Sequence, residues 1–149
     1  MEKNFFSFLS IESMRKYPPL SNLTRVCTKD YRVEGTKFVI KKGQMVFIPA
    51  NAIQNDPEIY PNPEVYDPDR FTPEEDSKRS PYAFLPFGQG PRNCIGLRFG
   101  MMQSKLGVAL LLNHYKFEPC SRSMNPIVYD NSTFVLTPKN GLYLKVTKL

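Results

Sequence analysis

Proline restricts the fold of this chain more than any other residue. The sequence holds fourteen prolines against eight glycines, and prolines recur throughout the stretch from Asp56 to Pro91. Each proline removes a backbone hydrogen-bond donor and disfavours helix at the residue before it. We therefore predict a long meander without regular structure over these residues. Such loops are uncommon in a compact domain and are usually functional when they are ordered.

The length and composition of the chain predict one globular domain. The 149 residues are 41% hydrophobic, which is enough for a packed core and too much for a disordered tail. No apolar stretch reaches the roughly 18 residues needed to cross a bilayer, and the N-terminus lacks the apolar run of a signal peptide. Three cysteines without a C-x-x-C pair and a single histidine argue against a disulfide framework, a zinc cluster and an enzyme that needs two histidines.

Regular elements are predicted before the meander. Residues 1–17 carry apolar and charged residues at helical spacing, and Pro18-Pro19 must end this helix. β-Branched and aromatic residues then predict three strands, at residues 26–31, 37–40 and 45–48, with turns at Glu34-Gly35 and Lys42-Gly43.

A helix and a hairpin are predicted after the meander. Residues 97–113 are strongly apolar, with leucines on more than one face, so we expect a helix that is buried nearly all round. Residues 134–136 and 142–146 flank Asn140-Gly141, a dipeptide typical of tight hairpin turns. This pattern predicts a terminal β-hairpin between the two runs.

The most informative segment is Phe87-Gly88-Gln89-Gly90-Pro91-Arg92-Asn93-Cys94-Ile95-Gly96, which we call the cysteine loop. Its glycines let the backbone bend and approach a flat partner closely. Cys94 stands where the turn becomes a helix, and the free N–H groups and dipole of a helix start favour a thiolate. Arg92 adds a positive charge that can bind a carboxylate through two hydrogen bonds, and Phe87 can screen the sulfur from water. Such a thiolate suits a single axial bond to iron.

Other interpretations of this segment are weaker. A lone cysteine is most often a small buried hydrophobe or an idle thiol, and this is our interpretation of Cys27 and Cys120. A dinucleotide-binding fingerprint would need glycine where Asn93 stands, and a phosphate-binding P-loop would need Gly-Lys-Ser/Thr. A cysteine–histidine nucleophile pair would need His114, which lies at the far end of the following helix.

The cysteine loop resembles the haem-binding loop of the cytochrome P-450 superfamily, F-G-x-G-x-R-x-C-x-G, at every specified position. Two further segments resemble the E-x-x-R helix and the P-x-R-F element of that family, namely Glu12-Ser13-Met14-Arg15 and Pro68-Asp69-Arg70-Phe71. The resemblance covers essentially the whole chain. Within the family, the sequence is similar to insect microsomal enzymes of the detoxification type, which act in xenobiotic metabolism.

This resemblance implies an α+β fold that forms the C-terminal part of the cytochrome P-450 fold. Its parts would be the E-x-x-R helix, a small antiparallel sheet, a coil meander, the cysteine loop, a long apolar helix and a terminal β-hairpin. Residues 1–149 would be a partial domain, the proximal half of the haem site, with no separate second domain.

The resemblance also implies roles for single residues. Cys94 would be the axial ligand of the iron of haem b, and thiolate ligation favours cleavage of the O–O bond. Arg92 and Arg25 would pair with the haem propionates, although Arg25 also suits an exposed strand end. Phe87 would pack beside the sulfur, and Phe87, Gly88 and Gly96 would be further cofactor-binding residues.

Other residues would support or line the site. Glu12, Arg15 and Arg70 would form a buried charge network that locks the meander against the E-x-x-R helix. The substrate side would be lined by Leu20, Leu23, Phe134 and Val135, for which ordinary core positions are as good an interpretation. No catalytic acid or base is expected in this chain, because the family's acid–threonine pair has only one candidate match, Glu34-Gly35-Thr36, and that match has strand-turn context.

The implied partners are molecular oxygen, a small apolar substrate and an NADPH-dependent flavoprotein reductase as electron donor. The net charge of +6 suits an acidic donor, with Arg98 and Lys105 as candidate contacts, and nucleic acid is not expected. The implied location is the cytosolic face of the endoplasmic reticulum membrane.

Two hypotheses follow: the chain is part of a haem-thiolate monooxygenase, or it is a non-catalytic truncated fragment or pseudo-enzyme that lacks the oxygen-activating helix.

Overall fold

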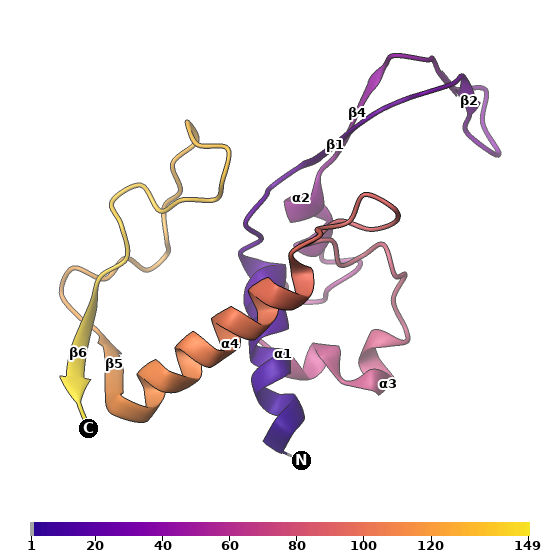
Figure 1. Ribbon diagram of the computed structural model, residues 1–149. Helices are drawn as coiled ribbons and strands as arrows, with labels where there is room; N and C mark the ends of the chain where they lie inside the picture. Colours follow the sequence, from indigo (N-terminus) through magenta and orange to yellow (C-terminus); the bar gives the residue numbers. More distant parts are fainter. Residues whose placement is uncertain (1) are drawn as a thin grey trace.

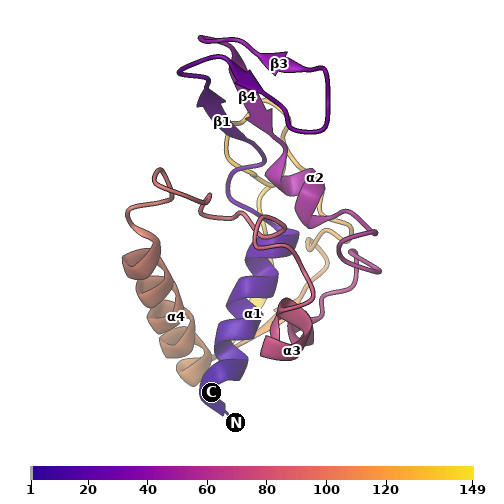
Figure 2. The ribbon, with the colours of Figure 1, turned by 90° about the vertical axis from the view of Figure 1, so that its right-hand side faces the viewer.

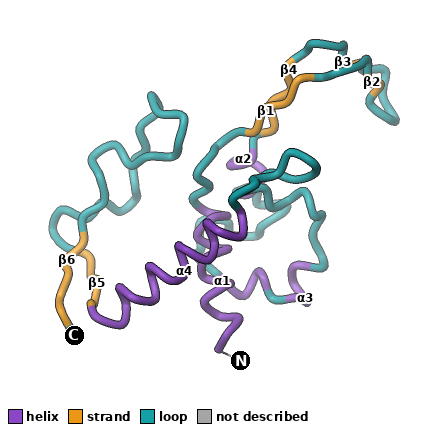
Figure 3. The backbone as a smooth tube through the Cα atoms, in the orientation of Figure 1, coloured by secondary structure: helices purple, strands orange, loops and turns teal. Residues whose placement is uncertain are grey.

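The computed structural model describes the backbone from Glu2 to Leu149 and the side chains from Phe6 onward. Its helices are α1 (Glu2–Lys16), α2 (Ala50–Gln54), the 3-10 helix η1 (Pro68–Phe71), α3 (Pro73–Asp76) and α4 (Leu97–His114). Its strands are β1 (Leu23–Val26), β2 (Tyr31–Arg32), β3 (Val39–Ile40), β4 (Met45–Ile48), β5 (Tyr115–Pro119) and β6 (Leu144–Lys148). The strands lie at two distant ends of the molecule with the helices between them (Figures 1 and 3). The predicted α+β class is confirmed.

The first helix confirms the prediction for residues 1–17, except that Met1 lies outside the described residues. α1 ends at Lys16, and the N–H of Tyr17 still donates to the carbonyl of Ser13 at 2.9 Å. Pro18 and Pro19 follow, so the helix stops where the backbone donors stop.

The strand pairs before the meander form a projecting antiparallel ribbon (Figure 1). β1 pairs with β4 from Leu23 opposite Ile48, and β2 pairs with β3. The predicted strand at residues 26–31 was therefore wrong in its bounds, because most of these residues lie between two separate pairs. The carboxylate of Asp30 accepts hydrogen bonds there from the Lys42 N–H and the Lys41 ammonium, both at 2.9 Å. This side-chain bonding takes the place of a continuous ladder.

The meander is less irregular than predicted, because it contains η1 and α3. Pro68 and Pro73 occupy the first positions of these two short helices, where a missing N–H costs nothing. The carboxylate of Asp67 also accepts from the N–H of Asp69 at 3.1 Å and caps η1. The same prolines that exclude long helices thus begin short ones.

A small core joins the meander to α1. Tyr60, Phe71 and Ala83 of the meander are buried, and Ile11 of α1 and Phe84 pack against them. The ring centroids of Phe71 and Phe84 lie 5.0 Å apart. The guanidinium of Arg79 lies 4.9 Å from the ring centroid of Tyr60, within cation–π range. The order of the meander therefore depends on burial and stacking against α1.

The expectation that the helix after Cys94 is buried nearly all round was wrong. None of the eighteen residues of α4, all of which the structure describes, is buried, and Leu106 and Leu110 are 59% and 55% exposed. α4 lies beside α1 and is inclined to it (Figure 2), and Lys105 donates to the hydroxyl of Ser7 at 2.8 Å. The reason is that the described chain packs few elements against a helix whose apolar residues encircle it. Among the described residues, no helix has both the length and the apolarity of a bilayer-crossing segment.

The terminal hairpin is also paired differently from the prediction. β6 pairs with β5, which directly follows α4, and not with residues 134–136. Val135 instead forms an isolated bridge with Leu20, and the N–H of Leu136 donates to the carbonyl of Pro19 at 3.0 Å. Gly141 does form the predicted turn, with φ of 76°. The turn signal was correct, but the residues before the turn pair elsewhere: Pro138 bridges Tyr129, and the N–H of Lys139 donates to the carbonyl of Val128 at 2.9 Å.

The buried hydroxyl of Tyr60 predicts a loss of stability in alkali. Burial raises the pKa of Tyr60, whose hydroxyl donates to the carbonyl of Ala83 at 3.3 Å. Because the unfolded chain ionises first, the stabilisation is complete below about pH 10 and falls as the pH rises further. We expect the wild type to lose more unfolding free energy than Tyr60→Phe between about pH 9 and about pH 11 in urea titrations. Equal losses would contradict the assignment.

Candidate functional site

The cysteine loop is a closed turn that leads into α4. The N–H of Cys94 donates to the carbonyl of Phe87 at 2.8 Å, and the N–H of Leu97 donates to the carbonyl of Cys94 at 3.3 Å. Gly88 and Gly90 have φ of 69° and 83°, a conformation that only glycine adopts at little cost. The sequence motif therefore encodes the path of the backbone as well as the side chains.

The thiol of Cys94 lies on the open side of this turn. Cys94 and its neighbour Ile95 are exposed, and a Cβ atom at Gly96 would lie 3.9 Å from the sulfur. The sulfur is thus not enclosed among aliphatic side chains, and small residues leave room beside it. A large flat ligand has free access to this atom.

Two arginines belong to the same region. A Cβ atom at Gly88 would lie 3.6 Å from Nη2 of Arg25 and 3.9 Å from Cδ1 of Leu23, so β1 lies against the cysteine loop. Arg25 is half-buried and donates through Nη1 to the carbonyl of Thr24 at 2.8 Å. Arg92 is exposed within the loop itself. The structure thus brings Arg25 to the loop from a strand almost seventy residues earlier in the chain.

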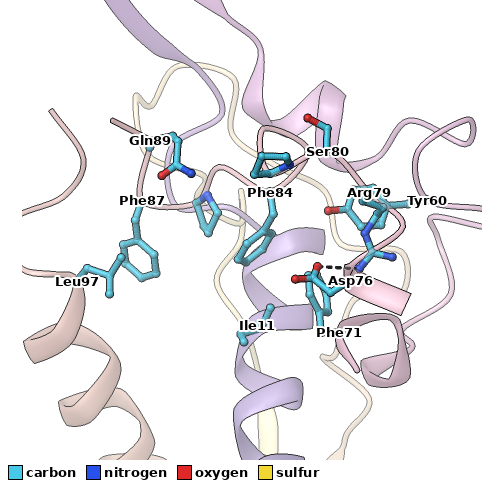
Figure 4. Close-up of a pocket in the computed structure, with 13 residues that line it drawn as sticks. Ile11, Tyr60, Phe71, Asp76, Arg79, Ser80, Phe84, Phe87, Gln89 and Leu97 are labelled. Carbon is cyan, nitrogen blue, oxygen red and sulfur yellow. Dashed lines mark hydrogen bonds and ion pairs between the residues drawn. The ribbon is translucent and has the colours of Figure 1, made fainter. Parts of the chain in front are cut away.

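Phe87 holds the loop through its backbone, while its ring lines a cavity of about 420 Å³. In Figure 4 the ring lies beside Leu97, across from Ile11 and Phe84, and the ion pair of Arg79 with Asp76 forms the opposite wall. The packing of Phe87 against the sulfur of Cys94 stays a prediction.

The structure brings Glu12, Arg15 and Arg70 together. Arg15 binds Glu12 through two hydrogen bonds, Nε to Oε2 at 2.7 Å and Nη2 to Oε1 at 2.8 Å, and both side chains are fully buried. Nε of Arg70 lies 3.8 Å from Oε1 of Glu12, an ion pair without a hydrogen bond. The three charges therefore form one cluster between α1 and the meander.

Both arginines of this cluster also bind backbone carbonyls, in the meander and at the end of α2. Arg15 donates to the carbonyls of Gln54 at 2.9 Å and Pro63 at 2.7 Å. Arg70 donates to the carbonyls of Pro61 at 2.7 Å and Asn62 at 2.9 Å. Charge-assisted bonds of this kind are stronger than neutral ones, and they hold a segment that has no ladder of its own.

Gln54 is a functional candidate that the sequence analysis missed. Its side chain is fully buried, Nε2 donates to the carbonyls of Met14 and Arg15, both at 3.0 Å, and Oε1 accepts from the N–H of Leu85 at 2.7 Å. Only its place two residues before Asp56-Pro57 could have drawn attention to it. A lone glutamine gives no sequence signal of burial.

The residues expected to line a substrate are only partly gathered. Leu20 and Val135 form a bridge, and Leu23 lies beside the cysteine loop, whereas Phe134 is 77% exposed. Of the two cations suggested for partner docking, Arg98 is exposed and Lys105 is already bonded to Ser7.

Comparisons with known proteins agree on one family. The sequence profile described as "Cytochrome P450" matches residues 11–145. "Cytochrome P450 6a8" of Drosophila melanogaster is 54% identical over 136 residues, which cover 91% of this chain and 27% of the relative. "Cytochrome P450 6A1" of Musca domestica is 51% identical over 138 residues, with coverages of 91% and 27%. "Probable cytochrome P450 6a23" of Drosophila melanogaster is 45% identical over 148 residues, with coverages of 99% and 30%. The chain therefore spans less than a third of the length of each of these relatives.

The buried pair of Glu12 and Arg15 predicts a large effect of a small substitution. Glu12→Gln removes the charge that compensates the buried guanidinium of Arg15, so we expect the free energy of unfolding to fall by about 3–5 kcal/mol. The matched control is Glu75→Gln, which alters an exposed pair with Lys78 at the same i, i+3 spacing. The control should show no measurable change in chemical denaturation. Similar losses in both variants would show that the pair is not effectively buried.

Proposed function

The chain belongs to the cytochrome P450 family, and we propose that it supplies the haem-thiolate side of a monooxygenase site, with Cys94 as the axial ligand of the iron. The observation that carries this proposal is the exposed thiol of Cys94 in a glycine turn at the start of α4. Family membership implies a haem cofactor. We infer that this is haem b.

The residues of the loop are suited to such a group. A porphyrin needs one axial donor and cations for its two propionates, and this region offers one exposed thiol and the guanidiniums of Arg25 and Arg92. Gly88 and Gly96 leave space that a side chain would take, and any Cβ at Gly88 would be strained by its positive φ. The donor set therefore fits the cofactor.

The residues of this chain would bind and orient the cofactor. Cys94 stands three residues before the start of α4 and would bind the iron through its sulfur. Arg25 and Arg92 would bind the carboxylates of the cofactor. When bound, haem supplies the redox chemistry that inserts one atom of molecular oxygen into a substrate. Glu12, Arg15 and Arg70 take no part in that chemistry and fix the meander from which the cysteine loop extends.

The remaining parts of the proposal concern partners and location. We infer that the electrons come from an NADPH-dependent flavoprotein reductase, which would dock near the exposed Arg98 of this chain, whose net charge is +6. The substrate would be a small apolar molecule, in keeping with xenobiotic metabolism, and Leu20, Leu23, Phe134 and Val135 stay candidates for its lining. The location would be the cytosolic face of the endoplasmic reticulum membrane.

A second candidate is a haem-binding chain without monooxygenase activity, a fragment or pseudo-enzyme. The open exposure of Cys94 and of α4 favours it, because controlled oxygen activation requires a site closed to water. Both candidates share the thiolate ligand. Product formation by the protein that contains this chain, assayed with reductase, NADPH and an apolar substrate, separates them, since only the first candidate turns over.

The assignment of the ligand is tested with matched cysteine variants. Purified chain is combined with haem, reduced and treated with carbon monoxide, and the Soret band is recorded. Wild type and Cys120→Ser should show the red-shifted band of thiolate ligation, since Cys120 lies in the segment after β5, apart from the loop. Cys94→Ser should lose this band completely. A band that persists in Cys94→Ser would overturn the assignment.

The charge cluster predicts a difference in cofactor retention. Arg70→Ala removes the bonds to the carbonyls of Pro61 and Asn62 and the second of the two cations paired with Glu12, so the meander should loosen and haem should be released faster. Lys78→Ala removes only an exposed charge pair and should release haem at the wild-type rate. Transfer of haem to a scavenging apo-haem protein measures both rates. Equal rates would contradict a role of the cluster in holding the site.

A further inference from the structure

We propose that Gln54 is a positioning residue that fixes the cysteine loop to the end of α1. This inference rests on the proposed role of Cys94 as ligand. Gln54 is the last residue of α2, its side chain is fully buried, and its amide joins segments that are about forty and thirty residues away in the chain.

The end of α1 requires two hydrogen-bond donors. In a helix, the carbonyls of Met14 and Arg15 would accept from the N–H groups four residues later, at positions 18 and 19. Both positions are proline and have no N–H, so these two carbonyls lose their helical partners. Nε2 of Gln54 donates to both carbonyls at 3.0 Å. The glutamine thereby satisfies two acceptors that the double proline leaves without helical donors.

The start of the cysteine loop requires an acceptor. The N–H of Leu85 is the last backbone donor before Phe87, because Pro86 has none. This N–H donates to Oε1 of Gln54 at 2.7 Å, in a segment where Leu85 and Pro86 are both buried. An unpaired N–H at such a place is costly, so the bond fixes the backbone where the loop begins.

Two further hydrogen bonds extend this fixation to the ligand. The carbonyl of Leu85 accepts from the N–H of Gly88 at 3.1 Å, and the carbonyl of Phe87 accepts from the N–H of Cys94 at 2.8 Å. Glutamine suits the position because its amide has two N–H donors and an acceptor oxygen on one long side chain. Glutamate has no donor when ionised, and histidine has only one donor when neutral. Gln54 therefore acts on Cys94 through Leu85 and the loop backbone.

The test compares three variants of the full chain. Gln54→Met keeps the length of the side chain but removes its donors and its acceptor. Phe71→Leu is the matched core variant, because Phe71 lies in the buried cluster of the meander and makes no bond to the loop amides. Gln103→Met is the same substitution at an exposed residue of α4.

The first readout is amide hydrogen exchange without haem. In Gln54→Met, the protection of the Leu85 and Cys94 amides should fall about tenfold relative to amides of the core. In Phe71→Leu, these two amides should lose no more protection than the core amides, and Gln103→Met should match the wild type. Unchanged protection at Cys94 in Gln54→Met, or an equal selective loss in Phe71→Leu, would overturn the proposal.

The second readout is the thiolate Soret band of the reduced carbon monoxide complex. Gln54→Met should show a smaller fraction of thiolate-ligated haem than Phe71→Leu, because only the former displaces the ligand loop. A fraction equal to that of Phe71→Leu would overturn the positioning role and show that Gln54 contributes only to overall stability. If the wild type itself lacks the band, the proposed function fails, whereas the hydrogen exchange result still decides the bonding role of Gln54.

Discussion

The buried pair of Glu12 and Arg15 is the interaction on which the arrangement depends. Two charges with no exposed surface are costly unless every polar atom around them is satisfied. Glu12 satisfies part of this requirement and also accepts from the N–H of Asp67 at 3.0 Å. The carbonyls of Gln54 and Pro63 and the side-chain oxygen of Asn55 satisfy the rest of the guanidinium. The meander must therefore approach α1 closely, or the pair would be stranded without partners.

Proline is also the source of the acceptors that this cluster needs. A proline-rich segment cannot form ladders, so its carbonyls remain available for side-chain donors. Arg15 and Arg70 use three such carbonyls, those of Pro61, Asn62 and Pro63. Pro18 and Pro19 have a similar effect at the end of α1, where the free carbonyls accept from Gln54. The prolines prevent regular structure, and they thereby leave backbone carbonyls free to accept the side-chain hydrogen bonds that order the chain.

The sequence predicted a structural feature correctly where that feature depends on residues that are neighbours in the chain. α1, α4 and the glycine turn before Cys94 each depend on neighbouring residues, and all three lie where the pattern placed them. The partner of β6 is set by contacts between distant residues, so the turn at Gly141 could not reveal it. The exposure of α4 likewise depends on which elements cover a helix, and an apolar pattern alone does not contain that information.

The candidate site divides in the same way. Cys94, Gly88 and Arg92 belong to one continuous motif and were found together, whereas Arg25 was expected only from the family resemblance, because it reaches the loop through the path of β1. Gln54 was missed because its importance depends on backbone N–H groups that are absent at distant positions. These are Pro18 and Pro19 after α1, and Pro86 at the start of the cysteine loop.

The position of Cys94 is therefore determined from the meander side of the loop. On that side, the loop continues from buried Leu85 and Pro86, which are held by Gln54 and by the core around Tyr60 and Phe71. On the other side, it continues into α4, none of whose residues is buried among those the structure describes. A rigid support on one side and a loosely covered helix on the other leave the backbone between Leu85 and Cys94 as the segment that sets where the sulfur lies. Substitutions that reach the ligand from a distance should consequently be found in α1, α2 and the meander more often than in α4.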